Sequence, residues 1–88
     1  MKHASPKTIH SLFPLLEQIR EIPGLKEKKQ GIFYRKSKAF LHFHEDGSQI
    51  YADVRLGGED FERFSSTTQN EQNVLLNRIR EFLQSTSA

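Results

Sequence analysis

The sequence predicts one α+β domain of order αβββα, in which a three-stranded antiparallel meander carries both helices on one face. Apolar residues recur every three or four positions near both ends of the chain, which is typical of amphipathic helices, and every second position between them, which is typical of strands. Two turn signals, Lys36-Ser37 and Asp46-Gly47, divide the middle segment. Helices gathered on one face of an antiparallel sheet bury the apolar side of each element.

The first predicted helix lies after Ser11, and Pro23-Gly24 ends it because neither residue continues a helix well. Ser5-Pro6 and Ser11 are alternative starts, since serine caps a helix and proline is tolerated in its first turn. The last helix is predicted to begin at the capping-box pattern of Thr68 and Glu71. Its apolar stripe consists of Leu75, Leu76, Ile79, Phe82 and Leu83.

Three strands are predicted between the helices, over residues 31–35, 38–45 and 49–56. Residues 25–30 have no apolar alternation and are predicted to be a polar connection. Residues 59–64 fit neither period well, so we expect an irregular segment held by its two Phe side chains.

The 88 residues are predicted to form a single domain, with residues 1–5 and 85–88 as loose tails. The absence of Cys excludes disulfides, thiol catalysis and cysteine metal sites. No apolar run approaches the length of about 20 residues that a membrane span needs, and no signal peptide is recognised. We therefore expect a soluble cytoplasmic protein with no membrane partner.

Charge is divided unevenly along the chain. Residues 1–44 carry nine Lys/Arg and three Asp/Glu, whereas residues 45–88 carry four Arg and eight Asp/Glu. The basic residues are densest between Lys26 and Lys38. Such a cluster attracts polyanions, or else forms a solvated lysine-rich loop.

The hairpin predicts which side chains share a face. With Asp46-Gly47 as the two turn residues, His42 lies opposite Tyr51 and Phe40 opposite Asp53. One face then contains only apolar residues and should meet the helices: Ala39, Leu41, Phe43, Ile50, Ala52, Val54 and Leu56, joined by Ile32 and Tyr34. The other face contains Phe33, Arg35, Phe40, His42, His44, Gln49, Tyr51, Asp53 and Arg55.

This second face, which is rich in aromatic and His side chains, has no remaining element to cover it. An uncovered aromatic patch usually marks a partner or a ligand. The sequence therefore predicts a small binding or interaction module that self-associates as a homodimer, with a small ligand as a further partner. No residue is assigned a catalytic role and no cofactor is predicted. The candidate ligand- or partner-binding residues are Phe40, His42, His44, Tyr51, Asp53 and Arg55.

A metal- or acid–base-dependent enzyme on the same face is the first alternative. His42 and His44 point the same way from one strand, and Asp53 lies diagonally across from His42 as a third ligand. Two imidazoles and a carboxylate form a known catalytic metal set. His42 could also pair with Asp53 or Tyr51 for proton transfer while Arg55 holds an anionic substrate. Because no nucleophile motif or phosphate loop accompanies them, an enzyme is the less favoured class. The ordinary alternative is that both imidazoles make surface hydrogen bonds.

Single-stranded nucleic acid is the second alternative partner. Phe33, Phe40 and Tyr51 would serve as stacking platforms among positive charges. Asp53 inside the patch, the acidic second half of the chain and the absence of an RNP-type motif argue against it.

The stretch from Ala39 to Ser48, with its His42-x-His44 strand followed by Asp46-Gly47-Ser48, resembles the central segment of the luciferase-domain family. The preceding Ile22-Pro23-Gly24 is also similar to that family. These are small, mostly uncharacterised bacterial proteins. The resemblance implies a bacterial origin, the central hairpin and a shared use of the His-x-His strand, without choosing among metal, ligand and partner.

Overall fold

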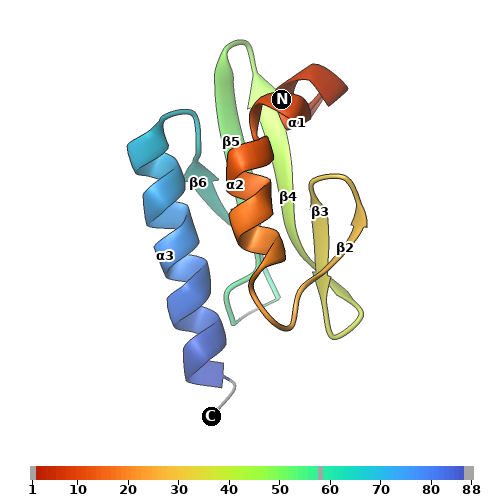
Figure 1. The fold of residues 1–88 in the computed structure, drawn as a ribbon, viewed down its shortest axis with the longest axis vertical. Helices are drawn as coiled ribbons and strands as arrows, with labels where there is room; N and C mark the ends of the chain where they lie inside the picture. Colours follow the sequence, from red (N-terminus) through yellow and green to blue (C-terminus); the bar gives the residue numbers. More distant parts are fainter. Residues whose placement is uncertain (1, 58, 87–88) are drawn as a thin grey trace.

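Six antiparallel strands form one sheet in the computed structural model, which describes residues 2–57 and 59–86 (Figure 1). Strands β2 to β6 follow one another in chain order across the sheet, and β1 pairs with β4. Helices α2 and α3 lie on the same side of the sheet. The elements are β1 (Lys2–His3), α1 (Pro6–Ser11), α2 (Phe13–Arg20), β2 (Lys26–Lys29), β3 (Ile32–Arg35), β4 (Lys38–Asp46), β5 (Gln49–Val54), β6 (Glu62–Ser65) and α3 (Gln69–Thr86).

The α+β class and the antiparallel sheet are confirmed, but the predicted three-stranded meander and its αβββα order are wrong. Strand β2 forms in the segment that we expected to be a polar connection, and β6 forms in the segment that we expected to be irregular. Both are four-residue strands at the ends of the β2-to-β6 path, with mostly exposed side chains. Backbone pairing holds such edge strands without the apolar alternation that a half-buried strand needs, so periodicity does not reveal them.

The N-terminal segment, expected to be a loose tail, is tied to the sheet. Lys2 lies opposite Glu45 and His3 opposite His44. The backbone N–H of Ala4 donates to the carbonyl of Phe43 at 3.1 Å. At the other end, α3 extends to Thr86, and residues 87–88 of the expected tail lie outside the described residues.

Two helices occupy the region where one was predicted, because both candidate starts are used. The Ser5 hydroxyl accepts from the N–H of Thr8 and caps α1, which has Pro6 in its first turn. Pro14 lies in the first turn of α2, where its missing N–H removes no intrahelical bond. The two prolines thus allow the chain to turn between short helices.

The capping box that precedes α3 is confirmed. The N–H of Glu71 donates to Thr68 Oγ1 at 3.2 Å, and the N–H of Thr68 donates to Glu71 Oε1 at 3.0 Å. The predicted apolar stripe of this helix faces the core, where Leu75, Leu76, Ile79 and Leu83 are buried and Phe82 is partly buried.

The predicted helix-facing side of the central hairpin is confirmed for its main members. Leu41, Phe43, Ala52 and Val54 are all buried in one core. The helical residues of the same core include Leu12, Leu15, Leu16, Ile19, Leu75, Leu76 and Ile79.

The hairpin turn lies one residue later than predicted. Asp46 pairs with Gln49, so Gly47 and Ser48 form the two-residue loop. Gly47 has a positive φ of 62° at the first loop position, where a type II′ turn favours glycine. The partner of each β4 residue therefore moves by two residues along β5. A shift of two preserves the face of every side chain, so the facial assignment on these paired segments survives although the pairing was wrong.

A β-bulge changes the faces at the β3–β4 pair. Phe33 lies opposite Leu41, but the next pair joins Tyr34 to Ala39, so Phe40 is an extra residue on β4. The sheet face that carries His42 and His44 is called the His-bearing face below. The prediction that Phe33 and Phe40 belong to it is wrong, because both are buried in the core. Phe40 stacks on Phe82 of α3, with ring centroids 6.2 Å apart. A bulge inserts one residue and so breaks the strict alternation on which the prediction depended.

Replacement of a core ring on β4 should lower the stability of the folded protein. We expect Phe43→Ala to lower the free energy of unfolding by about 3 kcal/mol or more, because it removes a buried aromatic ring and leaves a cavity. Chemical denaturation measures this change. The control is Val74→Ala, at a position that is 56% exposed, and it should change the stability by less than about 0.5 kcal/mol. Equal effects of the two substitutions would contradict the burial of Phe43 in the core.

Candidate functional site

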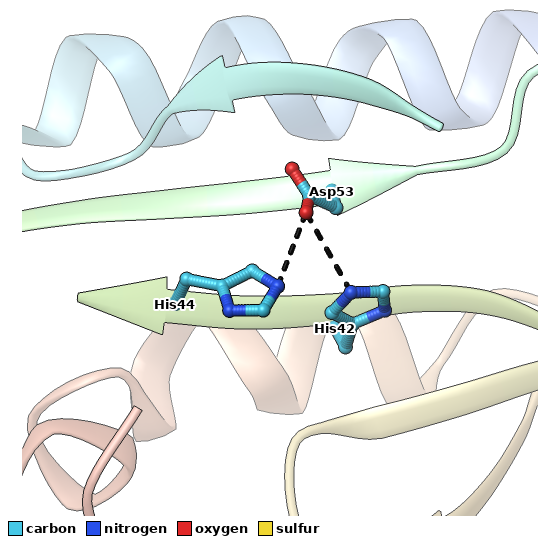
Figure 2. Close-up of side chains that lie close together, drawn as sticks. All are labelled: His42, His44 and Asp53. Carbon is cyan, nitrogen blue, oxygen red and sulfur yellow. Dashed lines mark ion pairs between the residues drawn. The ribbon is translucent and has the colours of Figure 1, made fainter. Parts of the chain in front are cut away.

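Three side chains converge on the sheet face opposite the core. His42 and His44 are two residues apart on β4, and Asp53 on β5 lies directly opposite His42. Figure 2 shows both imidazoles directed at one oxygen of Asp53. The Nε2 atom of His44 lies 3.1 Å from Asp53 Oδ2, and that of His42 lies 3.6 Å from the same oxygen. The one-residue shift of the turn thus makes Asp53 the direct neighbour of His42 and brings its carboxylate between the two imidazoles.

These three residues are shielded but not sealed from water. The side chain of Asp53 is only 8% exposed, whereas His44 and His42 are 15% and 20% exposed. The site is therefore a shallow one whose carboxylate lies deepest. A small solute can reach the imidazoles, while the carboxylate needs a positive or hydrogen-bonding partner because an isolated buried charge is strongly unfavourable.

Arg63 of β6 is that partner in the described structure. It lies opposite Asp53 in the β5–β6 pair and forms a bidentate ion pair, Nε to Oδ1 at 2.8 Å and Nη2 to Oδ2 at 3.0 Å. This charge-assisted pair holds the pKa of the Asp53 carboxyl below its ordinary value in spite of burial. The Arg63 side chain remains 49% exposed. Arg63 is not among the predicted site residues because β6 was not predicted to be a strand.

Two aromatic side chains form the walls of the site. The ring of His3, on β1, stacks on His44 with centroids 4.9 Å apart and lies 6.1 Å from the ring of His42. Phe61 meets His42 edge to face at 4.9 Å. His3 was missed because the segment that contains it was expected to be a loose tail. No pattern in the sequence indicates the β1–β4 pairing that places His3 beside His44.

Burial lowers the pKa of His42, and the neighbouring imidazole of His44 adds to this effect. The charge of Asp53 acts in the opposite direction, and His3 and Arg63 again lower the pKa. The neutral imidazole is therefore favoured at pH 7. This is the protonation state in which a ring nitrogen can offer a lone pair to a metal ion.

The remaining predicted site residues have different positions. Phe40 is buried in the core and takes no part in the site. Tyr51 lies opposite His44 on β5 and is partly buried. Arg55 follows β5 and places its guanidinium over the ring of Phe61 at 4.6 Å. Among the described residues, Asp53, His42 and His44 are the group that can offer three ligand atoms to one ion, and these atoms lie within 4.8 Å of one another.

Comparison with family models, with curated proteins and with solved structures gives no match. The resemblance to the luciferase-domain family therefore remains a prediction. Across residues 2–57 and 59–86, the helices lack the combination of length and apolar character that crossing a membrane requires.

The protonation of the site should make the metal-free protein less stable in acid. His42 and Asp53 both have lowered pKa values in the folded protein, so the unfolded chain binds more protons as the pH falls and the free energy of unfolding decreases. The contribution of His42 is lost as the pH falls below its ordinary value of 6.5, and that of Asp53 as it falls below 3.8.

Denaturation at a series of pH values, with a chelator present, measures this dependence. His42→Asn should reduce the slope between neutral and mildly acidic pH. Val74→Ala, which removes an exposed side chain and no titratable group, should keep the wild-type profile. A His42→Asn profile that is parallel to that of the wild type would contradict the shifted pKa of His42.

Proposed function

We propose that this domain binds a divalent transition-metal ion, with zinc as the reference ion, through His42, His44 and Asp53. The observation that carries the proposal is the convergence of two imidazole nitrogens on one carboxylate oxygen, at 3.1 and 3.6 Å. Two nitrogen ligands and one oxygen ligand are a donor set that zinc accepts, with further positions left for water or another ligand.

The spacing of these atoms supports the proposal. Zinc bonds of about 2.0–2.1 Å place neighbouring ligand atoms of a tetrahedral site roughly 3.3 Å apart. The two nitrogen-to-oxygen distances lie on either side of that value. All three ligand atoms lie within 4.8 Å of one another, so side-chain rotations that draw them to the tetrahedral spacing would complete the site on a backbone fixed by the β4–β5 pairing. Ligands on strands are held more precisely than ligands on loops.

Arg63 is the competitor of the metal ion in this proposal. Its guanidinium and a bound cation would both neutralise Asp53, and they cannot both occupy the same lone pairs. Because the side chain is half-exposed and on a terminal strand, it can turn outward while the backbone of β6 remains paired. Metal binding would then replace one positive partner of the carboxylate with another.

The ordinary alternative is an ion-pair cluster that ties β4, β5 and β6 together and never binds metal. The metal site and the structural cluster use the same contacts, so loss of a ligand residue alone does not distinguish the two hypotheses. Substitution of Arg63 does, because it would weaken a purely structural cluster, whereas in a metal site it would free a ligand.

Zinc titration of the wild type and four variants tests the proposal. His42→Ala, His44→Ala and Asp53→Asn should each weaken zinc affinity by at least the factor of about 10–100 that even outer-shell changes cause. Arg63→Gln should lower the stability of the metal-free protein and raise its zinc affinity. Calorimetry gives the affinities, and NMR of the imidazole nitrogens shows which rings coordinate.

The matched control is His10→Ala, which removes an exposed imidazole outside the site and should leave zinc affinity unchanged. Imidazole resonances of His42 and His44 that do not move with zinc would disprove the proposal. An Arg63→Gln variant that loses stability and gains no affinity would favour the structural cluster instead.

Self-association remains a prediction, and fewer exposed aromatic residues support it than the sequence indicated. Phe33 and Phe40 lie in the core, and Val74 on α3 is the large apolar side chain that stands exposed among the described residues. The burial of Phe33 and Phe40 also removes two of the three stacking platforms on which the nucleic-acid alternative depended.

A further inference from the structure

The C-terminal ends of α2 and α3 and the β3–β4 turn lie in the lower part of Figure 1. Residues of these segments line a hollow of about 560 Å³. Its apolar lining includes Ile22 and Leu83, which are almost fully buried. Arg35, Lys36 and Arg80 also line it. A volume of this size lies within the range of about 300–1,000 Å³ that is typical of small-molecule sites.

A second hollow of about 300 Å³ shares Arg35 and Lys36 with the first and extends the groove toward β5. It adds the charges of Lys38 and Arg55, and its aromatic lining comes from Phe40 and Phe82. The two hollows adjoin at Arg35 and Lys36, and we call them together the basic groove. Each hollow has apolar or aromatic lining residues as well as cations.

The positive charge of the basic groove exceeds the negative charge around it. Five cationic residues line the two hollows, and Glu21 is the one acidic residue among the described residues that do so. The C-terminal ends of α2 and α3 also face this region, and each contributes about half a negative charge. Even with both helix ends counted, the balance remains about three positive charges. The groove therefore attracts anions more strongly than the helix ends repel them.

The turn that carries Lys36 is conformationally costly. Lys36 and Ser37 have φ values of 51° and 69°, in the left-handed region that favours Gly or Asn. A lysine at such a position is unfavourable for the fold alone, and it brings a cation to the junction of the two hollows. Backbone strain of this kind is concentrated at functional sites.

Arg35 is placed beside the aromatic lining of the groove. Its guanidinium lies over the ring of Phe82 at 5.3 Å, a cation–π contact at a residue that lines both hollows.

We propose that the basic groove binds a small amphiphilic anion, with an apolar body on the Ile22 and Leu83 lining and a carboxylate or phosphate head among Arg35, Lys36 and Arg80. The volume and the short apolar lining favour a single small molecule. The proposed zinc ligands do not line this groove, so the inference stands or falls separately from the metal site.

Ten-carbon amphiphiles below their micellar concentrations provide the test. Decanoate and decyl phosphate present the two head groups on one tail, whereas decanol and decyltrimethylammonium present a neutral and a cationic head. We expect calorimetry to show binding of one or both anions, at least about tenfold tighter than decanol, with an affinity that falls as salt is added. The preferred anion identifies the head group.

Substitutions distinguish binding in the basic groove from attraction by the overall positive charge of the protein. Arg80→Gln should weaken anion binding by about fivefold or more, through loss of one charge-assisted contact. Lys36→Gly should weaken it similarly while raising the melting temperature, because glycine accepts the left-handed turn. Lys7→Gln, an equal loss of charge on exposed α1, should leave binding unchanged.

The proposal is overturned if decanol and decyltrimethylammonium bind as tightly as the anions. It is equally overturned if Lys7→Gln weakens binding as much as Arg80→Gln does. A Lys36→Gly variant that is more stable and binds the anions with wild-type affinity would show that the lysine is tolerated in the turn and not used.

Discussion

The pairing of β4 with β5 is the interaction on which the core and the candidate site both depend. Side chains of β4 alternate between the helix-facing core and the His-bearing face, and β5 supplies Ala52 and Val54 to the first and Asp53 to the second. A register change of one residue would expose the core residues and bury the imidazoles. The apolar contacts that stabilise the fold therefore also fix the geometry of His42, His44 and Asp53, so the site needs no separate scaffold.

Asp53 explains why the outer strands matter to the site. A carboxylate that is only 8% exposed requires compensation, and Arg63 provides it from β6 while the imidazoles approach from β4. Three adjacent strands are thus linked through one carboxylate. Breaking such a cluster from one side leaves a buried charge without a partner, which costs more than the intact cluster contributes. A metal ion at this point would satisfy the same requirement as the arginine does.

Much of the core was predictable from the sequence, because burial leaves a periodic pattern. The α3 stripe, the Thr68 capping box and the alternation around Phe43 all reflect one buried face. What the sequence could not show was structure held by backbone pairing alone, and His3 and Arg63 both lie on such strands. The bulge at Phe40 could not be predicted either. An extra residue in a strand shifts the alternation of side chains between the two sheet faces and leaves no mark in the composition.

The His-bearing face and the basic groove differ in how their charges are balanced. At the first, cationic and imidazole groups surround one buried carboxylate, so an incoming cation competes with a partner already in place. At the second, the cationic lining residues outnumber the acidic one among the described residues, so a net positive charge is available to attract an anion. A domain of this size uses its helix-facing side for stability. The two proposed sites lie instead on the opposite sheet face and at the C-terminal end of the helices.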